Sequence, residues 1–285
     1  MTASFDEHFF TSSDGLQLYY REFGANNAGT PVICLPGLTR NSRDFERIAA
    51  RIGKSRRVIT PDFRGRGKSA RDPEWQNYHP ATYVADTLAL LAALEIDRVI
   101  VIGTSLGGLC AMGLAAARPG LVSAVVMNDI GPEINPAGVA RIQSYTGRLT
   151  PVRNWDEAVQ QTREVYGKWL PGLDEADWLS MAQRAYREGA GGVPELDFDP
   201  AIGRAIRELP PAGADPWQLF DALIDTPVTL LWGVESDILS SEIIASMQAR
   251  KPNLKVVPVA NRGHTPLLDE PECVTAIDEL LRDVP

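Results

Sequence analysis

The chain has 285 residues, 44% of them hydrophobic and 23% charged, which is the composition of an ordinary globular protein. Its formal net charge of −9 and its pI near 5.0 give a surface that repels polyanions, so nucleic-acid binding is not expected as its main function. The length allows one large α/β domain or a domain with an insertion.

The cysteines and the apolar segments restrict the protein class further. Cys34, Cys110 and Cys273 lie far apart in the sequence, without metal-ligand spacing or the density of a disulfide scaffold. No segment reaches the roughly 18 to 20 apolar residues that a bilayer span needs, and residues 1–14 lack the features of a targeting signal. We therefore expect a cytoplasmic protein that binds no membrane and acts on a small-molecule substrate. The oligomeric state stays open.

The predicted elements begin with two strands at residues 8–12 and 16–23. The Asp14-Gly15 pair between them suits a tight hairpin turn. Short apolar runs follow that do not alternate with polar residues, which is the pattern of strands buried on both faces of a parallel sheet. These runs lie at residues 32–35, 57–60, 99–102 and 125–127.

Helical segments at residues 81–94 and 106–118 lie between these runs and give the order of a parallel sheet with crossover helices. The strand signal disappears from residue 132 to 225, where proline-broken amphipathic segments carry Trp155, Trp169, Trp178 and Trp217. It returns at 228–232 and 255–259, before a helix at 271–283. We predict an α/β core of residues 1–131 and 226–285 with a helical insertion at 132–225.

The segment 103–108 matches the pattern G-x-S-x-G where a buried strand ends and an Ala-rich helix begins. A serine on such a strained turn needs small neighbours, which Gly103 and Gly107 supply. The helix that follows offers free N–H groups to developing negative charge. Ser105 is therefore the predicted nucleophile, against the alternative of a chance glycine pattern.

A serine hydroxyl requires a base, usually a histidine that a carboxylate holds in one tautomer. Of the three histidines, His264 follows the last predicted strand, where parallel-sheet proteins gather their site residues. His8, in the opening hairpin, and His79, in a proline-flanked loop, fit structural or solvated positions better. We predict His264 as the base.

Three acidic residues compete for the third position of this triad. Asp237 follows the strand at 228–232 and gives the chain order Ser, Asp, His, one of the known orders of serine triads. Asp129 follows an earlier strand, and its loop can also reach the histidine, whereas Glu235 is a weaker competitor. We predict Asp237 as the acid, with Asp129 as the alternative.

Attack on a carbonyl also requires N–H donors for the oxyanion. The predicted donors are the backbone amides of Leu106, directly after the nucleophile, and Leu38, in the loop after the strand at 32–35. Gly37 lets this loop approach closely. Arg40 in the same loop is a candidate for binding a substrate carboxylate, with a solvent-facing arginine as the alternative.

No cofactor is expected. The segment 65–70 fits the relaxed dinucleotide pattern G-x-G-x-x-A, but a proline-containing loop follows where the phosphate-binding helix should begin. Gly67-Lys68-Ser69 resembles the end of a P-loop, but Asp62 occupies the position of its first glycine. Neither NAD nor ATP is supported, and no group of residues has metal-ligand spacing.

Together these segments resemble the α/β-hydrolase superfamily over nearly the whole chain. The matching pieces are Leu35-Pro36-Gly37, residues 61–69, the turn at 103–108, Leu231-Trp232-Gly233 leading to Asp237, and Gly263-His264. The resemblance implies an α/β-hydrolase fold with a mostly parallel eight-stranded sheet and a helical cap at 132–225. It points to capped members with a serine nucleophile: carboxylesterases, enol-lactonases and hydrolases of ring-fission products.

We predict hydrolysis of a small carboxylic ester or lactone through an acyl-enzyme on Ser105. Two alternatives stay open: hydrolysis of a carbon–carbon bond in a diketone by the same residues, and a ligand-binding protein on this fold with slow turnover. The four tryptophans of the insertion are expected to form an apolar roof over Ser105.

Overall fold

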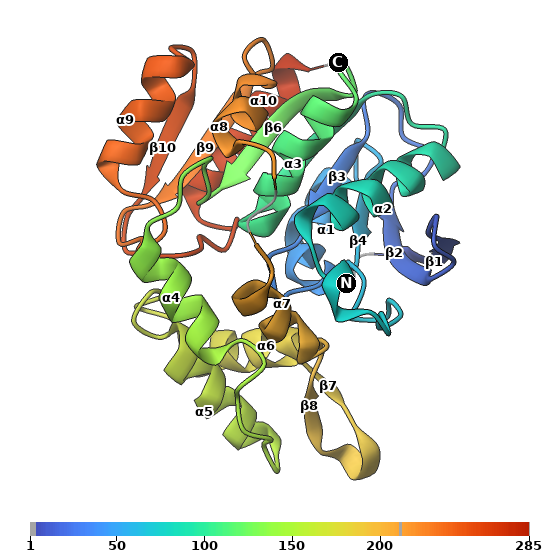
Figure 1. Ribbon diagram of the computed structural model, residues 1–285, viewed down its shortest axis with the longest axis vertical. Coiled ribbons are helices and arrows are strands. Elements are labelled where there is room, and N and C mark those ends of the chain that lie inside the picture. Colours follow the sequence, from blue (N-terminus) through green and yellow to red (C-terminus); the bar gives the residue numbers. More distant parts are fainter. Residues whose placement is uncertain (1–3, 211–212, 285) are drawn as a thin grey trace.

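The computed structural model describes residues 4–210 and 213–284 and contains an eight-stranded sheet in the order β1-β2-β4-β3-β5-β6-β9-β10 (Figure 1). Residues 1–3 of the N-terminal segment considered above lie outside this description, as do residues 211–212 of the predicted insertion and residue 285. Strands β1 (Asp6–Thr11) and β2 (Gln17–Phe23) form the predicted hairpin, and β2 pairs antiparallel with β4 (Val58–Pro61).

All later neighbours in this sheet are parallel, as their non-alternating apolar patterns predict. Val99, Ile100, Val101 and Ile102 of the central strand are completely buried. The predicted mostly parallel sheet with flanking helices is confirmed. Its remaining strands are β3 (Val32–Leu35), β5 (Val99–Thr104), β6 (Val122–Asn128), β9 (Val228–Gly233) and β10 (Lys255–Val259).

Helices cover both faces of the sheet and form one apolar core on each side. The first core contains residues of α2 (Pro80–Ala93), α3 (Leu106–Ala117), α8 (Pro216–Asp221) and α9 (Ser241–Arg250). The second contains residues of α1 (Glu46–Ile52) and α10 (Pro271–Asp283). Short 3-10 turns lie at Ser42–Phe45 and Trp75–Asn77.

The segment between β6 and α8 extends beyond the carboxyl ends of the parallel strands, below the sheet in Figure 1. It has two small apolar clusters of its own. It also contains a hairpin that the sequence patterns did not predict, because three-residue strands are too short to show a period. Its elements are α4 (Pro136–Tyr145), α5 (Trp155–Tyr166), α6 (Glu175–Ala185), β7 (Tyr186–Glu188), β8 (Pro194–Leu196) and α7 (Ala201–Glu208), with a 3-10 turn at Ala190–Gly192.

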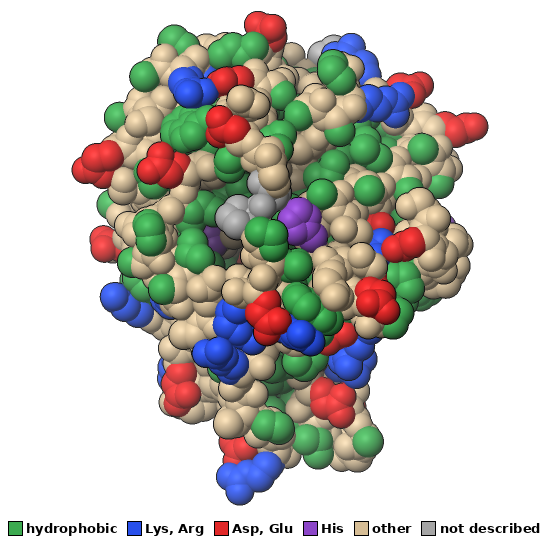
Figure 2. Space-filling model, viewed as in Figure 1, with side chains coloured by type: hydrophobic (Ala, Val, Ile, Leu, Met, Phe, Trp, Pro, Cys, Tyr) green, Lys and Arg blue, Asp and Glu red, His purple; other side chains and the backbone are tan. Residues whose placement is uncertain are grey.

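The helices and the visible surface each have one further feature. Among the described residues, no helix is both long and apolar enough to cross a membrane. On the face shown in Figure 2, basic and acidic side chains lie interspersed.

A buried arginine joins the first hairpin to the core. Arg64 is 1% exposed and binds Asp86 through Nε at 2.8 Å, Asp72 through Nη1 at 2.5 Å and Asp14 through Nη1 at 2.7 Å. Burial raises the pKa of Asp86, and the guanidinium opposes this shift. The positive charge of Arg64 is therefore the main stabilisation of the two buried carboxylates, those of Asp72 and Asp86.

Arg64→Leu is expected to lower the free energy of unfolding by about 3 to 5 kcal/mol, because it leaves Asp72 and Asp86 buried without their cation. Arg118→Leu is the matched control, since Arg118 and Asp97 form an exposed pair whose loss costs at most about 1 kcal/mol. Urea unfolding of both variants measures the difference. Equal losses would show that the Arg64 cluster is not a stabilising element.

Candidate active site

Ser105 lies on the sharp turn between β5 and α3, as predicted. Its backbone has φ 50° and ψ −113°, a strained conformation for a residue with a side chain. An added Cβ at Gly107 would collide with the carbonyl oxygen of Leu35, and one at Gly103 would collide with the backbone of Gly107. The glycines therefore permit the close approach that holds Ser105 at the carboxyl end of the sheet.

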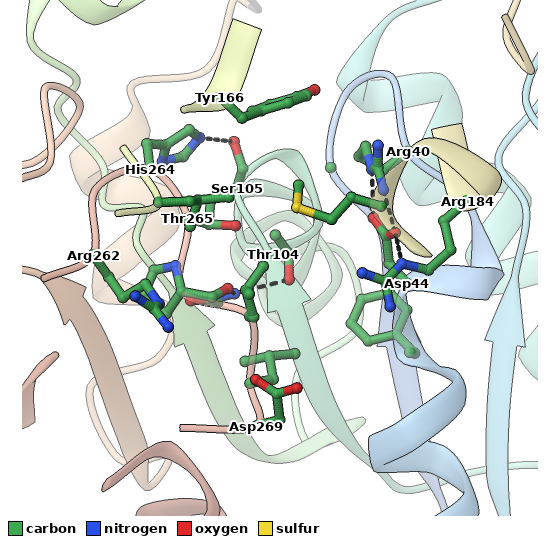
Figure 3. A pocket seen from close by; sticks show the side chains of 18 of the residues that line it. Arg40, Asp44, Thr104, Ser105, Tyr166, Arg184, Arg262, His264, Thr265 and Asp269 are labelled. Carbon is green, nitrogen blue, oxygen red and sulfur yellow. Dashed lines mark hydrogen bonds and ion pairs between the residues drawn. The ribbon is translucent and has the colours of Figure 1, made fainter. Parts of the chain in front are cut away.

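His264 contacts Ser105 directly. Its Nε2 lies 2.9 Å from Ser105 Oγ, and the ring is largely buried, with 8% exposed (Figure 3). The loop after β10 that carries His264 is fixed on both sides: Asn128 Nδ2 donates to Pro266 O at 3.0 Å, and Gly263 N donates to Trp169 O at 2.7 Å. The structure thus brings together the predicted nucleophile and base.

The carboxylate on His264 belongs to Asp129 and not to Asp237. Asp129 Oδ2 lies 2.8 Å from His264 Nδ1, and the Asp129 side chain is completely buried on the turn that follows β6. It also accepts hydrogen bonds from Gly233 N at 2.9 Å and from Ser236 Oγ at 2.6 Å. These donors fix the carboxylate in the orientation that faces the imidazole.

The prediction of Asp237 as the acid is wrong in this structure. Its carboxylate forms a bidentate pair with Arg141 of α4, with Nε–Oδ2 and Nη2–Oδ1 distances of 2.6 and 2.8 Å. Glu235, the weaker competitor, is exposed. Because β6 and β9 are neighbours in the sheet, the loops after both strands start beside the histidine. Asp129 is the first residue after β6 and reaches the imidazole, whereas Asp237 lies further along its loop and reaches Arg141.

The other two histidines have the structural positions expected of them. His8 Nε2 lies 3.4 Å from Glu22 in the first hairpin. His79 Nδ1 accepts the amide of Ala81 at 3.2 Å and so caps the N-terminus of α2. Neither contacts Ser105 in the described structure.

The loop after β3 lies beside the nucleophile, where the second oxyanion donor was predicted. A Cβ added at Gly37 would lie 3.9 Å from Ser105 Cβ. Arg66 Nε donates to Leu38 O at 2.8 Å and orients the peptide between Leu38 and Thr39, directly after the predicted donor. In the described part of the chain, neither the Leu38 amide nor the Leu106 amide donates to a protein acceptor. The two predicted donors are therefore near Ser105 and available.

Ser105 and His264 open into a cavity of about 260 Å³, a size suited to a small molecule. One wall comes from the loops of the core and the other from the insertion. The predicted tryptophan roof is wrong, because the insertion lines this cavity with other residues. Trp155 and Trp178 pack inside the insertion, Trp217 packs against the first core, and Trp169 lies against Gly263. The lining side chains of the insertion are Ile142, Tyr145, Tyr166, Leu170, Leu173, Asp177, Ser180, Met181 and Arg184.

Arg40 lies at this cavity and is not solvent-facing. Its Nε and Nη2 donate to the two oxygens of Asp44 at 2.6 and 2.5 Å. Burial opposes the charge on Arg40, but Asp44 raises its pKa above the usual arginine value. Arg184, on α6, faces the same carboxylate from the insertion (Figure 3). Sequence reasoning missed Arg184 and Ser236, since neither lies in a recognisable motif.

The arrangement supports nucleophilic catalysis by a serine. An Asp–His–Ser chain of hydrogen bonds can remove the hydroxyl proton as the oxygen attacks a carbonyl.

Burial raises the pKa of Cys110 to about 12, so this thiol is not a competing nucleophile at neutral pH. Within residues 4–210 and 213–284, no group of His, Cys and carboxylate side chains is placed to hold a metal ion.

The fold and this site define a class of enzymes. A family model described as the alpha/beta hydrolase fold matches residues 30–271, and the chain belongs to that family. A crystal structure of an alpha/beta hydrolase from Novosphingobium aromaticivorans superimposes with a TM-score of 0.93 at 42% identity and covers 100% of both chains.

Two named relatives are similar over most of their length. A 3-hydroxybutyrate-oligomer hydrolase from Cupriavidus necator is 32% identical over 90% of this chain and 89% of its own. A 2-(acetamidomethylene)succinate hydrolase from Mesorhizobium japonicum is 26% identical over 87% of this chain and 85% of its own. These similarities support a hydrolase.

Proposed function

We propose that this protein is a serine hydrolase of small carboxylic esters that forms an acyl-enzyme on Ser105. The observation that carries the proposal is the continuous contact from Asp129 through His264 to Ser105 at the floor of the cavity. The same residues would open a lactone, which is an internal ester. No cofactor is needed for this chemistry.

In the proposed reaction, Ser105 Oγ attacks the ester carbonyl while His264 takes its proton. The Leu38 and Leu106 amides stabilise the oxyanion, and Asp129 stabilises the imidazolium. His264 then gives the proton to the leaving alcohol, which leaves an acyl group on Ser105. A water molecule, activated by His264, releases the acid and restores the hydroxyl.

We propose a linear ester of a short hydroxy acid as the substrate class. The 3-hydroxybutyrate-oligomer hydrolase shares 32% identity over most of both chains, and the cavity here combines apolar walls with charged groups. Such a substrate has apolar carbon chains between polar carbonyl groups. A cytoplasmic location is part of the same proposal, because Cys34, Cys110 and Cys273 are free, as is usual in a reducing compartment.

We further propose that the predicted insertion, residues 132–225, acts up to the start of α8 as a cap that selects the substrate, because α8 itself packs in the first core. Two elements support this assignment: Tyr145 at the end of α4 and Met181 on α6 line the cavity that contains Ser105. The Arg141–Asp237 pair joins α4 to the core beside the site. Asp237 therefore serves to attach the insertion in this proposal.

The chemistry is tested by comparing three substrates: a linear trimer of 3-hydroxybutyrate, a lactone of similar size and a vinylogous diketone. We expect sustained turnover of the trimer, because His264 can protonate its alkoxide leaving group directly. Chromatography of the released acid gives steady-state kcat/KM. A burst of one equivalent followed by little turnover would favour the ligand-binding alternative, and preferential cleavage of the diketone would favour the carbon–carbon hydrolase.

A further inference from the structure

The wall of the cavity contains two arginines that share one carboxylate. Asp44 Oδ1 accepts Arg40 Nη2 at 2.5 Å and lies 3.5 Å from Arg184 Nε. The three side chains come from the loop after β3, its 3-10 turn and α6, and all line the cavity that contains Ser105 (Figure 3). This cluster therefore carries one positive charge more than its carboxylate neutralises.

The neighbouring ionic groups do not remove this excess charge. Arg47 pairs with Asp269 at 2.7 Å, and Arg262 pairs with Glu270 at 2.6 Å. The remaining carboxylate of the lining, Asp177, accepts the Asp174 amide in the capping box of α6 and forms no ion pair with Arg40 or Arg184 in the described structure. The excess positive charge thus stays at the Arg40–Asp44–Arg184 cluster.

Two donors of the cluster are buried without a hydrogen bond. Arg40 Nη1 and Arg184 Nε have almost no exposed area and make no hydrogen bond in the described structure. The Tyr166 hydroxyl lies near Arg40 and adds to the raised pKa of its guanidinium. Burial lowers the pKa of Arg184, and the nearby Asp44 offsets this shift only in part. Each guanidinium therefore has donor capacity that Asp44 does not satisfy, and an anion in the cavity can accept from it.

The Arg184 side chain is not needed to attach α6 to the core. Its backbone oxygen already accepts Asn41 Nδ2 and Arg43 Nη2, each at 3.0 Å. Arg43 also binds Asp197 at 2.5 Å. The attachment therefore persists when the Arg184 guanidinium is removed, which leaves that group available to a ligand.

We propose that Arg40 and Arg184 form a carboxylate subsite, so that the preferred substrates are esters with a free carboxylate. This subsite rests on the ester hydrolysis proposed above. A planar carboxylate matches the donor geometry of a guanidinium. Hydrogen bonds between two charged groups are also stronger than those between neutral groups. A linear hydroxy-acid oligoester carries such a carboxylate at one end.

The test compares monoethyl succinate with ethyl 4-oxopentanoate, which has a similar shape but no charge. The unaltered protein should prefer the charged ester at least about tenfold in kcat/KM. Arg184→Gln should lower kcat/KM for the charged ester by about tenfold or more and change the neutral ester by less than about twofold. Arg184→Lys should recover part of the preference.

Arg187→Gln is the matched control, because Arg187 is exposed, pairs with Glu195 and does not line the cavity. It makes the same change in net charge and should leave the preference intact. An unchanged preference in Arg184→Gln, or an equal loss in Arg187→Gln, would overturn the subsite.

A binding measurement separates this proposal from the proposed function. Isothermal titration of Ser105→Ala with the two esters reports on the subsite without turnover. If the unaltered protein hydrolyses neither ester, ester hydrolysis fails as the function. The subsite still stands if Ser105→Ala binds the charged ester more tightly and loses this preference with Arg184→Gln. Equal binding of both esters overturns the subsite.

Discussion

Asp129→Asn is expected to lower kcat by about 10⁴-fold, whereas Asp237→Asn should lower it by less than about tenfold. An asparagine in place of Asp129 keeps the shape of the contact but favours the wrong tautomer of His264 and removes the charge that stabilises the imidazolium. Asp237 binds Arg141 and does not touch the histidine. Steady-state kinetics on one ester measure both variants.

The controls for this prediction concern stability. Asp129→Asn can keep its oxygen on Gly233 N and place its NH2 group against His264 Nδ1 and Ser236 Oγ, which accept from it when the imidazole takes the other tautomer. Its melting temperature should therefore stay close to that of the unaltered protein. Asp237→Asn weakens the Arg141 pair, which is about four-fifths buried on both sides, and should lower the melting temperature. A large loss of kcat in Asp237→Asn with a mild effect in Asp129→Asn would place the acid at Asp237.

The nucleophile and base could be predicted from the sequence because each lies in a local pattern with one structural solution. The glycines around Ser105 fit only a turn with close backbone contacts, and His264 follows the last strand of the chain at the carboxyl edge of a parallel sheet. The sheet itself followed from short apolar runs whose residues are buried on both faces. The serine turn, the histidine loop and the strands are each determined by residues adjacent in the sequence, which is why they could be predicted.

The acid could not be decided from the sequence, because two loops at the same edge of the sheet each carry a suitable aspartate. Register places Asn128 of β6 beside Leu231 of β9, so Asp129 and Asp237 both follow strands that end near His264. The choice depends on which carboxylate finds other partners. Arg141 of α4 pairs with Asp237, and the pattern around Asp237 contains no sign of an arginine 96 residues away.

The cavity lining was also beyond sequence reasoning. Tryptophan content suggested an aromatic roof, but Trp178 packs with Met181 and Leu170 inside the insertion, and Trp155 packs around Ala158. The orientation of each helix decides which of its faces meets Ser105. For helices of 10 to 12 residues with partners on several sides, that orientation follows from tertiary packing.

Ser105→Ala should abolish ester hydrolysis, with a loss in kcat of up to about 10⁶-fold. The reason is that no acyl-enzyme can form without the serine oxygen, even with the base and the oxyanion donors in place. Ser180→Ala, a change at another serine of the same cavity, should keep activity within a few-fold. This contrast separates the loss of a nucleophile from a general disturbance of the cavity.

Intact-mass analysis after treatment with an organophosphonate tests the central claim most directly. The serine oxygen attacks phosphorus and expels the leaving group, which forms a stable adduct in the place of the acyl-enzyme. The account predicts one adduct in the unaltered protein and in Ser180→Ala, and none in Ser105→Ala. An adduct of equal yield in Ser105→Ala would contradict it, because another residue would then be the nucleophile.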